Sequence, residues 1–256
     1  MKRIFSIILF FISIQTMAQL KSIPSGAYHW SEAPAKKSGD REGRRFVEGT
    51  SPQFEYFEIH ATTQEKGAAP RPPHAQKDIE ELLIVKEGKM KFTINNESRV
   101  LGKGSIVLVA PQDMQSIENV GDGSLSYYVF MFRSNKPMDM ARSIKAGGSL
   151  LLDADTLTYV PSARGGGIKY FDRPTAMCEN FEMHITELKS KGPSHAPHQH
   201  IDTEIILIIE GDTEITIDGK NYKASAGDFY IMNSGEMHGV SNSLDAKCSY
   251  FAFKWR

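Results

Sequence analysis

The sequence has little cysteine. Among its 256 residues there are two, Cys178 and Cys248, and two cysteines cannot form the framework of a small disulfide-rich protein. Apolar residues make up 40% of the chain, so a hydrophobic core has to provide the stability. The sequence leaves open whether the two cysteines form a disulfide, because free cysteine is also a common buried residue.

An excess of charge of one sign is also missing. The chain has 30 Lys and Arg residues against 31 Asp and Glu residues, which gives a formal net charge of -1. A strongly basic chain, which is typical of proteins that bind nucleic acid, is therefore excluded. We expect no nucleic-acid partner.

A long apolar run occurs once, at the N-terminus. In "MKRIFSIILFFISIQTMAQL" two basic residues precede the apolar stretch, and the small residues Thr16 and Ala18 stand where a signal peptidase requires them. We therefore predict a signal peptide over residues 1–18. No second run of about 20 apolar residues follows, and no cysteine stands at the cleavage point to carry a lipid. These features predict a periplasmic or secreted protein with no membrane anchor.

The rest of the chain is a duplicated sequence unit. Residues 43–62 align with residues 167–186 at a shift of 124 positions, and after one extra residue in the first copy the shift becomes 123. The alignment indicates a duplicated unit of roughly 120 residues. We place the first domain at residues 19–140 and the second at residues 141–256. Identical pairs include Phe57 and Phe181, Glu58 and Glu182, His60 and His184, Thr62 and Thr186, His74 and His198, Glu81 and Glu204, and Tyr127 and Tyr250.

Each unit has the sequence pattern of β-strands. The segments "ELLIVKEG" and "KMKFTIN" and their partners "EIILIIEG" and "DTEITIDG" are short and rich in β-branched residues. Hairpin turns are expected at "TINNES" and "TIDGKN", where Asp218-Gly219 is the stronger signal. Helices should be few, with a turn or two at residues 136–145, which also read as the linker between the units.

Histidine and carboxylate residues of the second unit follow a regular spacing. The first run is Gly192, five residues, His198-x-His200, three residues, Glu204, six residues and Gly211. The second run is Gly227, five residues, Asn233-x-Gly235, two residues, His238, three residues and Asn242.

Together these runs resemble the two motifs of the cupin superfamily, with Asn233 where proline is usual. The resemblance covers both units and implies a bicupin, which is an all-β fold of two tandem jelly-roll β-barrels. It also implies that the second barrel binds a metal ion through His198, His200, Glu204 and His238.

The residue types agree with this expectation. On a strand, His198 and His200 would point to the same face about 7 Å apart, which suits two ligands of one ion. Three imidazoles and one carboxylate suit a divalent transition metal ion, either Mn, Fe, Ni, Zn or Cu, and leave two positions open on a six-coordinate ion. The alternative is a histidine-rich loop that binds metal adventitiously.

The first unit departs from the motif. In the four ligand positions it has His74, Gln76, Glu81 and Gln115, so two imidazoles are replaced by weakly coordinating amides. Glu80 competes with Glu81 for the carboxylate position. We therefore predict that the first site is empty or weak and that this unit serves as a scaffold.

Other residues can contribute to the pocket. His195 precedes the first ligand and can contact substrate or lie in a solvated loop. Tyr250 and Met232 can line the pocket, although such side chains in barrels are usually core. For the repeated pair His60 and His184, packing or a hydrogen bond between domains is the preferred interpretation.

The leading functional hypothesis is a metal-dependent enzyme that acts on a small oxygen-rich organic molecule, such as a sugar or sugar acid, by isomerase, lyase or dioxygenase chemistry. The alternative is a non-catalytic protein that binds or senses a small ligand through the metal. The general base is not identified by any motif. The partner is a small-molecule substrate, and a homodimer is compatible with the sequence.

Overall fold

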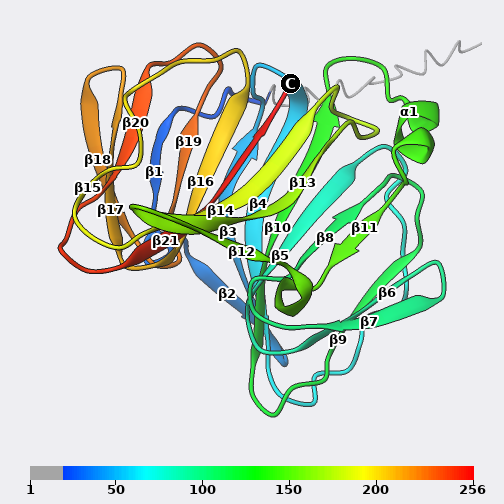
Figure 1. Ribbon diagram of the computed structural model, residues 1–256. Helices are drawn as coiled ribbons and strands as arrows, with labels where there is room; N and C mark the ends of the chain where they lie inside the picture. Colours follow the sequence, from blue (N-terminus) through cyan, green and yellow to red (C-terminus); the bar gives the residue numbers. More distant parts are fainter. Residues whose placement is uncertain (1–19) are drawn as a thin grey trace, which may run out of the picture.

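The computed structural model describes residues 20–256, and the predicted signal peptide at residues 1–18 lies outside them. The described part contains 21 strands, one α-helix and one short 3-10 helix (Figure 1). The expected all-β fold is confirmed. The α-helix, α1 (Met140–Lys145), lies within the segment predicted to contain a helical turn. Among the described residues, no helix has the length and apolar character needed to cross a membrane.

The first unit contains most of one seven-stranded sheet and a three-stranded sheet. The strands of these sheets are β2 (Ala35–Ser38), β3 (Arg41–Gly49), β4 (Phe54–Gln64), β5 (Glu80–Glu87), β6 (Met90–Ile94), β7 (Glu97–Leu101), β8 (Ile106–Val109), β9 (Gln115–Asn119), β10 (Leu125–Ser134) and β11 (Leu150–Leu152). The large sheet has the order β11-β8-β5-β10-β4-β3-β2, and the small sheet has the order β7-β6-β9.

The second unit repeats this plan with a four-stranded small sheet. Its strands are β1 (Gly26–Tyr28), β12 (Tyr159–Ser162), β13 (Gly165–Arg173), β14 (Phe181–Leu188), β15 (Gly192–Pro193), β16 (Thr203–Glu210), β17 (Asp212–Ile217), β18 (Lys220–Ser225), β19 (Phe229–Met232), β20 (His238–Asn242) and β21 (Cys248–Trp255), and the 3-10 helix is η1 (Ala154–Thr156). The large sheet has the order β1-β19-β16-β21-β14-β13-β12, and the small sheet has the order β15-β20-β17-β18.

The two large sheets pack against each other, and the small sheets lie at the outer sides (Figure 1). The largest core cluster joins aromatic residues of both large sheets, among them Phe54, Phe130, Phe253 and Trp255. Each barrel has a second, separate core between its large and small sheets. Central strands β5 and β16 are therefore buried on both faces, which explains their continuous apolar runs, whereas β6 and β17 alternate between buried and more exposed residues.

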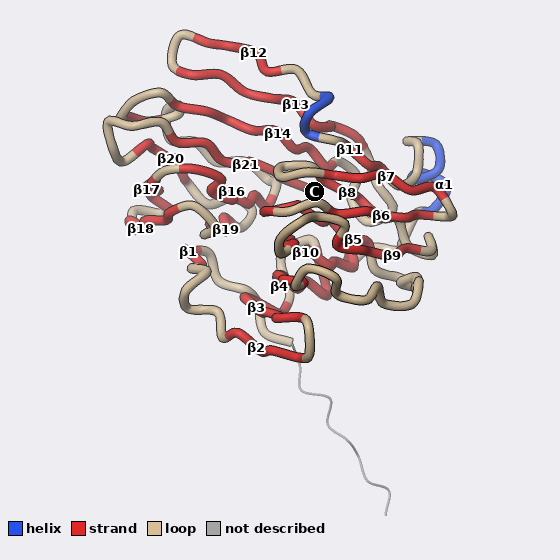
Figure 2. Tube along the Cα trace, turned by 90° about the horizontal axis from the view of Figure 1, so that it is seen from below, coloured by secondary structure: helices blue, strands red, loops and turns tan. Residues whose placement is uncertain are grey.

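The units exchange strands. Strand β1 precedes the first unit in the chain but pairs with β19 of the second, and β11 follows α1 but pairs with β8 of the first. Figure 2 shows β1 beside β19 and apart from β2 and β3. The domain division at residues 140 and 141 stays a prediction, and the sheets do not follow it, because each unit completes the sheet of the other.

Both predicted hairpin turns are present. Asn95 and Asn96 join β6 to β7 with φ angles of 45° and 74°, and Asp218 and Gly219 join β17 to β18 with φ angles of 44° and 78°. Two consecutive positive φ angles are the signature of a type I′ turn. In both turns the first side chain also accepts a hydrogen bond from a backbone N–H just before β9 or β20.

The two cysteines are not bridged. Cys178 and Cys248 are both buried free thiols. Cys178 lies in the core between the units. It is therefore a small buried apolar residue, which was the alternative to a disulfide.

Candidate metal centre

Four side chains of the second unit converge on one point. His198 and His200 lie in the connection between β15 and β16, Glu204 lies in β16, and His238 begins β20. One nitrogen or oxygen atom from each lies within 4.8 Å of the others. The structure thus brings together all four residues that the motif suggests as ligands.

The two closely spaced histidines reach this point from a loop. Our expectation that both lie on a strand is wrong, because Pro197 lacks the N–H that would extend a strand before His198. Instead, His198 forms an isolated bridge with His238: the N–H of His238 donates to the C=O of His198 at 2.8 Å, and the N–H of His198 donates to the C=O of His238 at 2.9 Å. The backbone N–H of Gly235 donates to the C=O of His200 at 2.8 Å. The ring centroids of the two histidines are 5.2 Å apart.

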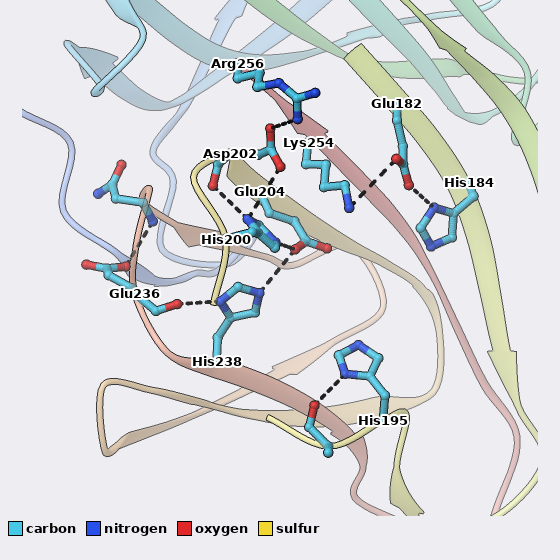
Figure 3. Close-up of polar contacts among 12 residues, drawn as sticks. Glu182, His184, His195, His200, Asp202, Glu204, Glu236, His238, Lys254 and Arg256 are labelled. Carbon is cyan, nitrogen blue, oxygen red and sulfur yellow. Dashed lines mark hydrogen bonds and ion pairs between the residues drawn. The ribbon is translucent and has the colours of Figure 1, made fainter. Parts of the chain in front are cut away.

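Backbone carbonyls fix the orientation of two imidazoles (Figure 3). Nδ1 of His200 donates to the C=O of Asp202 at 3.0 Å, and Nδ1 of His238 donates to the C=O of Glu236 at 2.8 Å. A carbonyl can only accept, so Nδ1 carries a proton in each ring, and with a metal ion bound Nε2 would be free to coordinate it. Both Nε2 atoms face Oε2 of Glu204, at 2.9 and 3.2 Å. Such outer hydrogen bonds are typical of histidines that bind metal through Nε2.

The charges of the cluster suit a cation. Burial opposes ionisation of Glu204, yet its hydrogen bonds to His200 and His238 hold its pKa down at about 2. The pKa of His198 is lowered by burial and by the neighbouring imidazoles, which keeps that ring neutral. The hydrogen bond to Glu204 raises the pKa of His200, because the carboxylate favours the protonated ring. A metal ion would take the place of that proton.

The environment of His198 also fits an ion. Within residues 20–256 its Nδ1 is buried without a hydrogen-bond partner, which is uncommon for a buried polar atom. Three imidazoles and one anionic carboxylate form a donor set that divalent transition metals accept. The residues present therefore fit a metal ion.

The three suggested pocket residues occupy different places. His195 is exposed at the rim, with its ring centroid 4.6 Å from that of His198. Tyr250 and Met232 are buried in the core of the second barrel, and Met232 is the cross-strand neighbour of Glu204. Burial raises the pKa of Tyr250 to about 12. The positions of Tyr250 and Met232 therefore agree with the alternative that they are core residues. Of the three, His195 is the residue that an incoming molecule can reach.

In the first unit the corresponding residues bind one another. Gln76 donates to one oxygen of Glu81 at 3.0 Å, and Gln115 donates to the other at 2.5 Å. His74 is exposed. These four residues line a cavity of about 180 Å³. Two amide N–H groups thus donate to the Glu81 carboxylate, where the second unit has imidazoles.

The neighbouring glutamates of the first unit have separate environments. Glu81 faces the cavity, whereas Glu80 lies in the interface between the units and accepts hydrogen bonds from Thr175 and from the backbone of Met177. Burial raises the pKa of Glu80 to about 7. The structure therefore places Glu81, and not Glu80, in the position that corresponds to Glu204.

Two polar residues beside the cluster, Glu182 and Lys254, were given no role by the sequence reasoning. Glu182 of β14, Lys254 of β21 and Glu204 of β16 are cross-strand neighbours in one row. Lys254 Nζ is 3.8 Å from Glu182, and His184 Nδ1 is 3.5 Å from the same carboxylate (Figure 3). The sequence contained a signal, since Lys254 alternates with Phe253 and Trp255 and so shares the face of Tyr250.

For the repeated histidines, the part of the preferred interpretation that placed a hydrogen bond between domains was wrong. His60 lies 2.9 Å from Glu58 and His184 lies 3.5 Å from Glu182, so each contacts a carboxylate of its own strand and not the other unit. His60 lines the cavity of the first barrel. Both histidines lie on the barrel face because the opposite face of their strands packs between the units.

The comparisons with known proteins agree with this fold. The family model described as "Cupin domain" matches residues 60–131 and 184–253. No curated protein matches the sequence.

Several solved structures are similar in fold at low identity. AerE from Microcystis aeruginosa has a TM-score of 0.67 at 15% identity, over 90% of this chain and 99% of that one. Oxalate decarboxylase of Lactobacillus farciminis, solved as a formate complex, has a TM-score of 0.69 at 13% identity, over 93% and 88%. Protein Ylba from E. coli has a TM-score of 0.61 at 16% identity, over 88% and 94%.

Proposed function

The chain belongs to the cupin family, and from that premise we propose that it is a metal-dependent enzyme acting on a small oxygen-rich organic molecule. The observation that carries the proposal is the cluster of His198, His200, Glu204 and His238. A divalent ion held there would withdraw charge from a bound oxygen and stabilise the negative charge that forms when a neighbouring proton leaves.

The protein residues prepare the site for this role. The carbonyls that accept from Nδ1 of His200 and His238 hold the two rings in place, so the ligand atoms are positioned before any ion arrives. Glu204 supplies the one negative charge among the four ligands. Four protein ligands leave room for a substrate on an ion of higher coordination number.

An enzyme is favoured over a binding protein by the wall of the second barrel. A binder of apolar ligands needs no proton donor or acceptor, whereas here Glu182, His184 and Lys254 face the barrel beside the cluster. Their side chains are partly exposed. These groups are candidates to move a proton to or from a molecule held at the cluster.

The reaction proposed is of isomerase or lyase type, with dioxygenase chemistry as the alternative. A lyase is supported by the structural neighbours named as oxalate decarboxylases, whose substrate is a small organic acid. A neutral sugar or a sugar acid would also present adjacent oxygens to an ion.

The test combines metal analysis with a substrate screen. The protein is purified without added metal, its metal content is measured, and sugar acids, ketoses, small organic acids and flavonols are tested for turnover. We expect about one ion per chain and turnover of one of these classes. Binding of a compound without turnover would support the non-catalytic alternative, and protein without a bound ion after incubation with Mn, Fe, Ni, Zn and Cu would contradict the proposal.

We also propose that the protein is exported. The support is the N-terminal sequence, with its apolar stretch and the small residues Thr16 and Ala18. The intact mass of the exported protein should correspond to a chain that begins near Gln19. A mass that retains residues 1–18 in the exported fraction would contradict a periplasmic or secreted location.

A further inference from the structure

We infer that Lys254 binds an anionic group of the substrate beside the metal-ligand cluster, so that the substrate is a small hydroxy or oxo acid and not a neutral sugar. The inference rests on the proposed function, because it places the anion next to the ion that the cluster would hold. It adds the chemical class of the substrate and the residue that selects it.

The position of Lys254 follows from strand register. In β21 it lies directly opposite Glu182 of β14 on one side and Glu204 of β16 on the other. Residues opposite each other in antiparallel strands project to the same face of the sheet. The adjacent Phe253 and Trp255 point to the core between the units, so Lys254 points into the barrel that contains the cluster (Figure 3).

The ammonium group is available to a ligand. A lysine that served only to neutralise a buried carboxylate would be tightly paired and enclosed, whereas Nζ of Lys254 is 3.8 Å from Glu182 and its side chain is 30% exposed. A partly exposed and loosely paired ion pair of this kind contributes little to stability. Its charge can therefore be used by an incoming anion.

The first unit shows that the fold does not require this charge. In the same row of that barrel Met131 stands between Glu58 and Glu81, with the same cross-strand pairing. Met131 lines the first cavity together with Glu81. A cation thus occurs in the barrel that has the ligand cluster and is absent from the corresponding position in the barrel that lacks it.

The charges at the site favour an anion. A divalent ion held there and Lys254 would supply three positive charges, Glu204 and Glu182 supply two negative charges, and the neighbouring Arg256–Asp202 pair cancels, so one positive charge would be left over. A monoanionic ligand would neutralise it, while a neutral sugar would leave it uncompensated in a partly desolvated barrel. An acid that bears a neighbouring hydroxyl or carbonyl oxygen could bind the ion and Lys254 together.

The test compares two probes of the same shape and different charge. Glycolate and its neutral amide, glycolamide, are titrated by calorimetry into protein whose metal content has been measured. The wild type should bind glycolate about tenfold more tightly or better than glycolamide. Lys254→Met, which installs the residue of the first unit, should lose this preference and keep both its ion and its affinity for glycolamide. Lys254→Arg should retain most of the preference, and the exposed Lys220→Met serves as the control for loss of one positive charge elsewhere.

A second variant separates binding from a structural ion pair. Glu182→Gln should strengthen glycolate binding, because it removes a carboxylate that competes for Lys254. If Lys254 served only to pair with Glu182, this variant would lower the melting temperature as much as Lys254→Met does and leave glycolate binding unchanged, which would overturn the inference.

The failure of the inference is distinct from that of the proposed function. If Lys254→Met holds one ion and prefers glycolate as strongly as the wild type does, only the inference is overturned. Wild-type protein that holds no ion contradicts the proposed function, and the inference then falls with it.

Discussion

The two barrels have the same walls and differ in what their central carboxylate contacts. In the first barrel Gln76 and Gln115 donate N–H groups to Glu81. In the second barrel His200 and His238 aim Nε2 atoms at Glu204 while backbone carbonyls hold their Nδ1 protons.

The difference shows how the residues at the ligand positions can change without a change of the fold. A carboxamide presents a donor to the carboxylate and satisfies it directly, whereas a neutral imidazole presents a lone pair that needs a cation between itself and the carboxylate. Amides thus satisfy the carboxylate in the first barrel, and a cation would satisfy it in the second. The aliphatic cores of both barrels contain none of these residues.

The largest effect should come from removing an imidazole of the second barrel. His238→Ala should lower metal affinity by roughly 100-fold or more, because ligand geometry fixed by the backbone cannot be supplied by another residue. Activity should fall with the metal. Elemental analysis after dialysis and a thermal melt in chelator are the measurements, and the melt should show that the barrel persists without the ion, unlike a zinc finger.

The matched change in the first barrel is the control. Gln115→Ala, and likewise His74→Ala, should leave the metal content near one ion per chain. Two ions in the wild type, with one lost on substitution of His74, would mean that the first site works and that the scaffold interpretation is wrong.

A second ion should be gained when the first barrel is given the imidazoles of the second. The double substitution Gln76→His and Gln115→His leaves His74 and Glu81 in place and restores the full donor set. Metal content should rise from about one to about two ions per chain. The corresponding change of the second barrel, His200→Gln with His238→Gln, should empty it. A double histidine variant that is folded by circular dichroism and still binds one ion would show that the cavity shape, and not the amides, keeps the metal out.

A smaller effect, on stability, should distinguish the units through Glu80. Its counterpart is Thr203, and burial between the units raises the pKa of Glu80 from 4.5 to about 7. A carboxyl group with a raised pKa in the folded state binds more protons there than in the unfolded chain, so stability falls as the pH rises from about 4.5 to about 7. The full loss amounts to roughly 3 kcal/mol.

Glu80→Gln should remove this pH dependence, because the amide oxygen can still accept from Thr175 and the backbone of Met177. Urea unfolding of both proteins at pH 5 and pH 8 is the measurement. The variant should gain stability over the wild type as the pH rises. An equal difference at both pH values would show that Glu80 is ionised in the folded protein throughout this range.

Much of the fold could be predicted from local sequence. The two type I′ turns follow from Asn95-Asn96 and Asp218-Gly219, since these residue types tolerate positive φ. The exchange of β1 and β11 could not be predicted, because strands of three residues carry too little pattern to show which sheet they join. Pairing of that kind depends on long-range geometry.

The candidate site, like the fold, could be predicted only in part from the sequence. The resemblance to the cupin motifs brought together the four ligand candidates, because the motifs record which residues meet across two strand pairs. Lys254 was missed because no motif contains it, and its role depends on which face of β21 points inward. That face is set by the packing of Phe253 and Trp255 between the units, which became visible only when both large sheets were in place.

The smallest effect should come from the two hairpin turns. Asn96 has a φ of 74° at the position where the second unit has Gly219 at 78°. Glycine adopts positive φ without the steric penalty of a side chain, so Asn96→Gly should stabilise the protein by about 0.5 kcal/mol. Gly219→Asn, the reverse change in the second unit, should destabilise it by a similar amount. Equilibrium unfolding in urea at constant m value measures both. If Asn96→Gly were destabilising, the Asn96 side chain would stabilise the turn by more than its positive φ destabilises it. The two hairpins would then not be equivalent despite their shared geometry.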